Sequence, residues 1–285
     1  MLGLGRAVEA KGELGAELLE RTVAVVTQLI GQAHQDGAQR IGLVGTEALR
    51  NARDGSVLAD LIRAGTGQQL RILAGEMEAR LSYLGATSFW VPRGNPATVV
   101  DVGGGSTEVV HGLGSRPANG TSLKLGSDRI LTATRAADPP TPRQRVDAEM
   151  RISMVLEAAP EAARRGMVIA TGGTASNLPV LLGLWRALPD SKNGLREEGK
   201  RPPWLTLSRD NIERAVRLAA THPSSEVATH TGLSPARARL MAGGVLILRG
   251  LLERYRAAEL TVTERGLRDG VLLRLAAAPA PSPPA

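Results

Sequence analysis

The chain has 285 residues, and 42% of them are hydrophobic, a normal share for a globular protein with a buried core. This length suits one large domain or two modest ones, and the usual domain size favours two. The chain contains no cysteine, which excludes a disulfide scaffold, a thiolate metal site and a cysteine nucleophile. The net charge is +7, and only four of the 35 basic residues are lysine. This arginine-rich charge suits either attraction to a polyanion or a solvated surface.

Several classes of partner and location are disfavoured at this stage. No apolar run approaches the roughly 20 residues that span a bilayer. Charged Glu9, Lys11 and Glu13 interrupt the first residues, which therefore lack the apolar stretch of a secretion signal. We expect a cytoplasmic protein without a membrane partner. Aromatic residues make up only 2% of the chain, and single-stranded nucleic acids usually bind on stacked rings, so we do not expect nucleic acid as a partner.

The first part of the chain shows alternating helical and strand patterns. Apolar residues at helical spacing predict helices, and short apolar runs predict strands. The predicted helices span 13–34, 57–64 and 76–85, with a further short helix after Thr46, and the predicted strands span 40–45 and 70–73. This alternation is typical of an α/β fold.

A proline- and glycine-rich break at 92–96 separates this part from the rest and indicates a domain boundary. Beyond it the predicted strands span 97–102, 107–112, 122–125, 167–170 and 260–263. The predicted helices follow Gly126 and Gly173 and span 143–158, 209–220, 235–255 and 266–276. Residues 189–203 are expected to form a surface loop. We predict domains at 1–93 and 94–275 and a disordered tail at 276–285, and we leave open that the last helix packs on the first domain.

The most specific motif is VVDVGGGSTEVV at 99–110. Gly103, Gly104 and Gly105 form a predicted turn between two strands, where the absence of side chains lets backbone N–H groups approach an oxyanion. The hydroxyls of Ser106 and Thr107 add donors. The alternative is a structural glycine turn, but the length of the motif favours phosphate binding.

The same hairpin carries two acids. Asp101 ends the first predicted strand, where a carboxylate would suit a metal-linked or hydrogen-bonded role, and Glu108 begins the second. A purely structural aspartate is the alternative.

A second glycine cluster, ATGGT at 170–174, stands where a predicted strand turns into a helix. The N–H groups and the positive dipole end of a helix N-terminus favour a bound phosphate. Taken singly the motif is weak, because many α/β turns look like this. Two such loops in one chain predict two sides of one phosphate site.

Two further segments supply acidic and basic side chains. In GEMEARLSYL at 75–84, Glu76 and Glu78 are two positions apart and cannot share a helix face, so only one is expected to face a site. Such a carboxylate could deprotonate water beside a bound phosphate. In GTEALRNAR at 45–53, Arg50 could contact phosphate, although an ordinary surface arginine is the simpler interpretation.

Together these segments resemble the Ppx/GppA phosphatases, the exopolyphosphatases and guanosine pentaphosphate phosphohydrolases of the actin-like ATPase superfamily. The matching stretches run in family order: GTEALRNA, GEMEARLSYLGA, VVDVGGGSTEVV, LKLGSDRI, TGGTASNL, GLSPARARLMAGGVLIL and ELTVTERGLRDGVL. The resemblance covers about residues 4–275. It implies a two-lobed α/β fold, actin-like and ribonuclease H-like, with an interlobe cleft.

The resemblance also assigns roles to individual residues. Glu78, directly before Ala-Arg, matches the family's catalytic base, and Asp101 matches its acid implicated in Mg²⁺ binding, where Glu108 is the neighbouring candidate. The phosphate-contacting positions of the family match Arg50, Gly103, Gly104, Gly105, Ser106, Gly172, Gly173 and Thr174. The implied reaction is attack of water on a terminal phosphoryl group with Mg²⁺ as cofactor.

The sequence departs from the family pattern at both ends. Family members usually begin with a strand ending in Asp-x-Gly-[Ser/Thr]-Asn-Ser, and no such segment precedes Leu4. We therefore expect a first lobe that is N-terminally truncated by roughly 30 residues, the length of two or three strands, through a misassigned start or a real loss. The chain also lacks the helical HD-type extension and resembles the short form of the family.

The leading hypothesis is a Mg²⁺-dependent phosphohydrolase that releases orthophosphate from inorganic polyphosphate or guanosine pentaphosphate. The alternative is a catalytically impaired protein that binds polyphosphate or a guanosine polyphosphate. An actin-like kinase of sugars or acetate is disfavoured, because Glu78 stands in a phosphatase-type context and no adenosine pocket is recognisable. A homodimer is left open.

Overall fold

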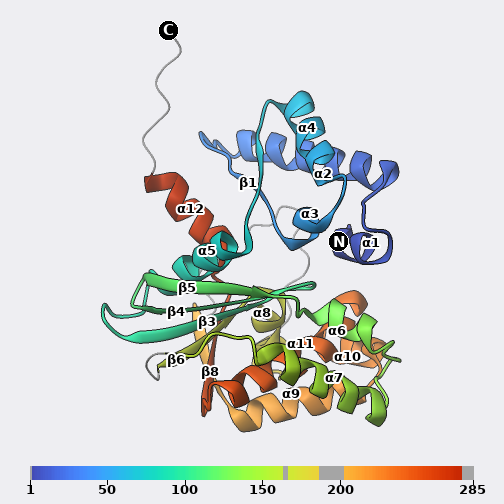
Figure 1. The fold of residues 1–285 in the computed structure, drawn as a ribbon, viewed down its shortest axis with the longest axis vertical. Helices are drawn as coiled ribbons and strands as arrows, with labels where there is room; N and C mark the ends of the chain where they lie inside the picture. The colour runs from blue at the N-terminus through green and yellow to red at the C-terminus, as the bar shows by residue number, and fades with distance from the viewer. Residues whose placement is uncertain (1, 163–165, 186–201, 278–285) are drawn as a thin grey trace. The chain divides into compact units, whose positions relative to one another are not determined.

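The computed structural model describes residues 2–162, 166–185 and 202–277 (Figure 1). Its internal contacts divide the chain into two compact units: unit 1 comprises Met1–Glu78 and Val271–Ala285, and unit 2 comprises Ala79–Gly270. Both divisions fall inside helices, namely α5 (Gly75–Thr87) and α12 (Leu267–Ala277). The domain boundary predicted at 93–94 therefore does not coincide with the limits of these units, and it stays a prediction.

Unit 1 is built mainly of helices around a small apolar cluster. Its elements are α1 (Leu4–Lys11), α2 (Ala16–Gln35), β1 (Leu43–Gly45), α3 (Glu47–Asn51), α4 (Gly55–Thr66) and β2 (Leu70–Ile72). Leu19 of α2 and Leu58 and Ile62 of α4 are buried in the cluster with Leu14 and Leu49. Each helix therefore buries one apolar stripe, as its spacing predicts.

The two strands of unit 1 determine where its next helices begin. β1 and β2 pair in parallel, with Leu43 opposite Leu70 and Gly45 opposite Ile72. The N–H of Leu73 extends the pairing by donating to the Gly45 carbonyl at 2.8 Å. Parallel strands end at the same edge of a sheet, so α3 and α5, which follow them, both begin at that edge.

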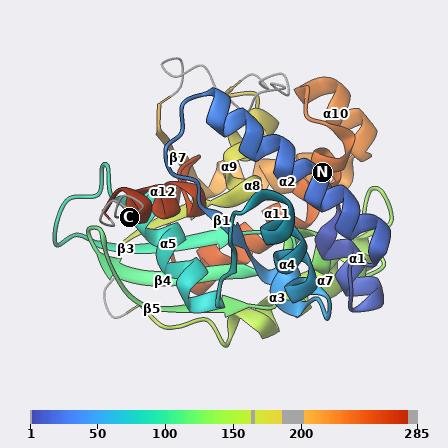
Figure 2. The ribbon, with the colours of Figure 1, turned by 90° about the horizontal axis from the view of Figure 1, so that it is seen from above.

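Unit 2 contains a mixed six-stranded sheet. Its strands are β3 (Pro96–Val102), β4 (Thr107–Leu113), β5 (Arg116–Leu123), β6 (Met167–Thr171), β7 (Trp204–Ser208) and β8 (Glu259–Thr263). The spatial order is β5-β4-β3-β6-β8-β7, with β3, β6 and β8 parallel and the other neighbours antiparallel. Figure 2 shows β3, β4 and β5 side by side. The predicted hairpin across the glycine turn is confirmed.

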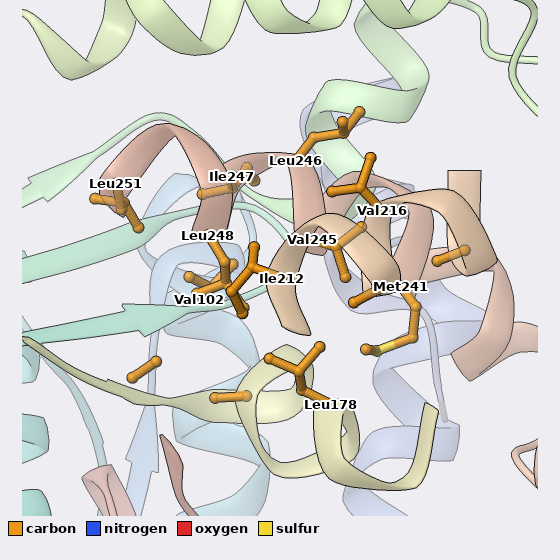
Figure 3. Packing of buried hydrophobic residues seen from close by; sticks show 14 of the residues in the cluster. Val102, Leu178, Ile212, Val216, Met241, Val245, Leu246, Ile247, Leu248 and Leu251 are labelled. Atoms are coloured by element: carbon orange, nitrogen blue, oxygen red, sulfur yellow. The ribbon is translucent and has the colours of Figure 1, made fainter. Parts of the chain in front are cut away.

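Alternate residues of β3 serve the two faces of this sheet, as strand geometry requires. Val100 and Val102 belong to the larger apolar cluster, which also contains Leu178, Met241 and Leu248 (Figure 3). The helices of unit 2 are α6 (Ser127–Ala133), α7 (Pro142–Leu156), α8 (Gly172–Leu181), α9 (Arg209–Thr221), α10 (Ser224–Thr231) and α11 (Pro235–Arg254). On the other face, a second cluster is formed by Ala79, Tyr83, Ala86, Val91, Ala97, Val99, Val110 and Ile169.

Most predicted elements are confirmed, with ends that shift by a few residues. The strand predicted at 122–125 is wrong, because the strand lies at Arg116–Leu123. Pro117 and Gly120 argue against a strand in sequence, but β5 is an edge strand, where a missing N–H is tolerated. Three short elements were not predicted: α1, β7 and α10.

Two predicted segments fall partly outside the described residues. Of the surface loop expected at 189–203, only residues 202 and 203 are described. Because α12 extends to Ala277, the first two residues of the predicted tail are helical, and the rest of that tail lies outside the described residues.

Among the helices of the described part, none has the length and apolar character needed to cross a bilayer. The cytoplasmic location stays a prediction.

Replacing Tyr83 with phenylalanine tests the second cluster. The Tyr83 side chain is fully buried, and its hydroxyl donates to the Gly114 carbonyl at 2.8 Å. Removing that bond is expected to lower the free energy of unfolding by about 1–3 kcal/mol, because the buried carbonyl loses its partner. Urea unfolding at neutral pH measures the loss.

The same substitution changes the response to alkaline pH. Burial raises the pKa of Tyr83 to about 12, whereas an unfolded tyrosine ionises near pH 10. The stabilisation that comes from the buried, neutral Tyr83 hydroxyl is therefore complete below about pH 10, and it is lost as the pH rises through about 12. The unfolding free energy of Tyr83→Phe should fall less steeply between these values than that of the wild type. Parallel curves would contradict this assignment.

Candidate phosphate and catalytic site

In unit 1 the structure brings Glu78 and Arg50 together. Glu78 lies in the first turn of α5 and is only 6% exposed, and Arg50 projects from α3. Nη1 of Arg50 donates to Oε2 of Glu78 at 3.0 Å and to the carbonyl of Leu73 at 2.6 Å. The parallel pairing of β1 and β2 explains this meeting, because both helices begin at the same strand edge.

The structure distinguishes the two glutamates of α5. Glu76 is exposed and Glu78 is buried, so the helix presents one of them to the protein and one to solvent. Arg50, predicted to contact phosphate, makes a salt bridge with Glu78 and remains 25% exposed at its side chain. Its guanidinium has five donors, so contact with an anion is compatible with the pair.

In unit 2, the glycine turn Gly103–Ser106 is held by its carbonyl groups. The N–H of Ser127 donates to the Gly103 carbonyl, those of Asp128 and Arg129 donate to the Gly104 carbonyl, and Arg129 Nε donates to the Gly105 carbonyl at 2.8 Å. Within the described residues, no hydrogen bond is donated by the N–H groups of Gly104 and Gly105. The first turn of α6 therefore fixes a loop whose remaining groups are donors, which suits an anion.

Gly104 adds an independent sign of ligand binding. Its backbone is not left-handed, and a Cβ added there would meet no atom within 4 Å. The fold itself therefore does not require glycine at this position. Close approach of a ligand to the backbone would require it. Ser106, the fourth phosphate-loop position, is buried.

Asp101 lies at the end of β3, beside both glycine loops. Its Oδ2 accepts a hydrogen bond from Ser82 of α5 at 2.5 Å. Burial raises the pKa of Asp101, and the Ser82 hydroxyl opposes that shift. A Cβ added at Gly172 would overlap Oδ1 of Asp101. Gly172 begins α8, so the carboxylate stands against the first residue of the second predicted phosphate loop.

Glu108 faces the same side of the sheet as Asp101. The two residues are opposite each other in the antiparallel β3–β4 pair, where cross-strand Cβ atoms lie roughly 4.5–5.5 Å apart. Glu108 is 3% exposed, and its Oε1 accepts from Ser122 Oγ at 2.7 Å.

Two carboxylates fit the oxygen preference of Mg²⁺, which commonly binds one or two carboxylates and completes its shell with water and phosphate oxygens. Asp101 and Glu108 are the residues that would hold it. The described residues contain no cluster of three or more metal-ligating side chains, so protein groups alone would not complete its coordination.

The second loop, Gly172–Thr174, forms the first turn of α8. Its N-cap, Thr171, makes no capping hydrogen bond to the helix and instead donates to the Arg265 carbonyl at 2.7 Å. The first N–H groups of a helix have no partner inside it and attract anions. Thr174 is 3% exposed and packs against Gly244. Its hydroxyl therefore faces the interior, and its contribution to phosphate binding would come from its N–H group.

Comparison with known proteins identifies the family of this chain. The model of the Ppx/GppA phosphatase family matches residues 1–278. The chain belongs to the Ppx/GppA phosphatase family. Exopolyphosphatase 2 of Mycobacterium tuberculosis is 28% identical over 282 residues, which cover 96% of this chain and 86% of that protein. A guanosine-5'-triphosphate,3'-diphosphate pyrophosphatase of Photobacterium profundum is 25% identical and is covered to 52%.

Solved structures give the same answer for the fold. The Aquifex aeolicus PPX-GPPA enzyme is 25% identical, with a TM-score of 0.79 over 96% of this chain and 88% of that one. An exopolyphosphatase from Cytophaga hutchinsonii is 20% identical, with a TM-score of 0.83 over 96% and 86%. The predicted family, its α/β fold and its class, a hydrolase of phosphoric anhydrides, are therefore confirmed, and the actin-like assignment stays a prediction. The predicted roles of individual residues stay predictions.

Two residues near this Ppx/GppA site were not predicted. Ser82 lies four residues after Glu78 in α5, on the same helix face, and that spacing was the available signal. Arg237, in the first turn of α11, places its guanidinium against Gly173 of the second loop. It belongs to the stretch GLSPARARLMAGG, which supports the family resemblance, but no local pattern distinguishes it from Arg239.

The contact between Asp101 and Gly172 can be tested with two alanine substitutions. Gly172 and Gly183 both have a left-handed φ, of 88° and 70°. A Cβ at Gly183 would meet nothing within 4 Å, whereas at Gly172 it would overlap the Asp101 carboxylate. Gly183→Ala should cost about 1 kcal/mol of unfolding free energy from backbone strain alone. Gly172→Ala should cost about 1–3 kcal/mol more through the overlap. Chemical denaturation measures both, and equal losses would show that Asp101 does not restrict this position.

Proposed function

We propose that this Ppx/GppA protein hydrolyses the terminal phosphoric anhydride bond of inorganic polyphosphate and releases orthophosphate, with Mg²⁺ as cofactor. The observation that carries the proposal is the pairing of β3 with β6. It sets two loops rich in backbone donors at one edge of the sheet, with Asp101 between them. An oligophosphate presents several anionic groups in a row, which suits two adjacent anion sites.

Glu78 is the proposed general base. A base must accept a proton from water while remaining fixed in direction, and the 3.0 Å bond from Arg50 fixes this carboxylate. Arg50 is itself held by the Leu73 carbonyl, so the pair is anchored to backbone rather than to another mobile side chain. We infer that Glu78 orients and deprotonates the attacking water while Arg50 offsets negative charge near the phosphate.

Asp101 and Glu108 are the proposed ligands of Mg²⁺. When bound, the ion would offset charge on the phosphate oxygens. Ser82 donates to Asp101 and Ser122 donates to Glu108, and these hydrogen bonds help to hold the two carboxylates in position. The donors of Gly104, Gly105 and the first turn of α8 would bind the remaining phosphate oxygens, and Arg237 would add a cation beside Gly173.

Polyphosphate is preferred as substrate over guanosine pentaphosphate for two reasons. The net charge of +7 favours a long polyanion. The relatives with the larger shared coverage carry the name exopolyphosphatase, whereas the chain spans about half of the guanosine-polyphosphate relative.

Replacing Glu78 tests the proposed base, with Glu76 as the matched control. Glu78→Gln keeps the shape and the Arg50 contact but removes the proton acceptor, so phosphate release from polyphosphate should fall about 10²–10⁴-fold in kcat. Glu76→Gln, on the exposed side of the same helix, should release phosphate at the wild-type rate. Equal rates for Glu78→Gln and the wild type would remove Glu78 from this role.

The same assay distinguishes the enzyme from the alternative, a protein that only binds its ligand. A wild-type chain that binds polyphosphate or guanosine pentaphosphate in equilibrium dialysis, but releases no phosphate with Mg²⁺, would favour that alternative. Faster release from guanosine pentaphosphate than from polyphosphate would overturn the substrate preference and leave the proposed chemistry intact.

The proposed metal site predicts a specific loss in Asp101→Asn. Removing one negative charge should raise the Mg²⁺ concentration for half-maximal phosphate release roughly tenfold or more, because few protein ligands share the ion. Glu226→Gln, an exposed acid on α10, is the control and should leave this concentration unchanged. The measurement is phosphate release by enzyme that has been freed of metal with a chelator and is then titrated with Mg²⁺. Full activity in excess chelator would contradict a metal-dependent reaction.

A further inference from the structure

Helix α7 carries apolar side chains on two opposite faces. Ala148, Ile152 and Leu156 are buried in the larger cluster of unit 2, where α7 packs against α11. On the outward face Val146, Met150 and Met154 are 56%, 60% and 67% exposed. The outward face of a solvated helix is normally polar, so three large apolar side chains in a row mark a contact surface.

The sequence of the outward face is symmetric about Met150. Val146 and Met154 lie four residues before and after it, and Arg143 and Glu157 lie seven residues before and after it. At about 100° per residue all five fall within roughly 40° of one line along the helix. Both charged residues are exposed. When the direction of the helix is reversed about Met150, each apolar residue takes the position of the other apolar residue, and the arginine and the glutamate exchange positions.

We propose that a second copy of this chain docks on this face, with the two α7 helices antiparallel about a two-fold axis at Met150. Met150 then faces Met150 of the other copy, Val146 faces Met154, and Arg143 faces Glu157. A parallel arrangement would instead oppose arginine to arginine and glutamate to glutamate. The charges therefore select the antiparallel arrangement, whose two halves are identical as two-fold symmetry requires.

A groove beside α7 enlarges the available surface. It has a volume of about 530 Å³ and is lined by Glu149, Ser153 and Glu157 of α7 and by Leu246, Gly250 and Glu253 of α11. A specific interface buries roughly 800 Å² of surface on each partner, and the contact between two helices alone is smaller than this. The walls of the groove would therefore have to contribute to the interface as well. Glu149 and Arg151 lie to the two sides of the contact line and form ion pairs within the chain, with Arg249 and Asp147 respectively. The inference does not depend on the proposed hydrolase.

Cysteine cross-linking tests the arrangement directly, because the chain contains no cysteine of its own. A disulfide forms only when the two Cα atoms can approach within about 7 Å. Met150→Cys should give a covalent dimer on oxidation, whereas Val146→Cys and Met154→Cys alone should not. The double variant Val146→Cys/Met154→Cys should cross-link again. Leu29→Cys, at an exposed apolar position of α2, is the control for random collision.

Mass in solution gives a second, independent test. The wild type should sediment at twice 29.9 kDa, and Met150→Arg, which places two like charges at the axis, should halve that mass while leaving the circular dichroism spectrum unchanged. Arg143→Glu and Glu157→Arg should each weaken the dimer, and the two together should restore it.

Three outcomes would overturn the proposal. They are a monomeric wild type whose Met150→Cys variant cross-links no more than Leu29→Cys, cross-linking by Val146→Cys alone, and a monomeric chain that binds a different protein on α7.

Discussion

The parallel pairing of β3 with β6 is the constraint on which the site in unit 2 depends. It aligns Asp101 with Thr171, so each strand reaches its last paired residue at the same level. The chain then leaves β3 through the glycine turn and leaves β6 through the first turn of α8. Two loops that are some 70 residues apart in sequence are thereby placed at one edge, where open α/β sheets characteristically bind ligands.

That proximity restricts the residues that carry it. Because Asp101 stands against Gly172, a side chain at residue 172 is excluded by sterics as well as by its φ of 88°. The first turn of α6 holds the carbonyls of the other loop, and Gly126 is packed against Gly104 so closely that a side chain there would overlap its backbone. Glycine is therefore required at these positions for different reasons. Packing requires it at Gly172 and Gly126, whereas at Gly104 only the approach of a ligand would require it.

The sequence could predict the loops because their chemistry is local. Glycine turns, the Asp-Gly-Gly-Gly-Ser-Thr-Glu block and strand-to-helix junctions are each contained in a few consecutive residues, so the sequence alone predicts both loops as candidate phosphate sites. The Arg50–Glu78 pair could not be found in this way, because it depends on two three-residue strands that pair across more than 20 residues. The orientation of Thr174 and the position of Arg237 depend on α11, which lies still further along the chain.

Edge strands and short polar helices were the hardest elements to predict, since neighbouring structure rather than intrinsic pattern stabilises them. Helix α7 shows the opposite difficulty. Its ends were predicted to within two residues. Because apolar residues lie on two opposite faces of the helix, however, the sequence pattern does not show which face is buried. Burial decides it: Ile152 enters the layer that also contains Val100 and Val102 of β3, and Met150 does not. That apolar layer lies between the outward face of α7 and the sheet, so association through Met150 would leave the glycine loops at the strand ends uncovered.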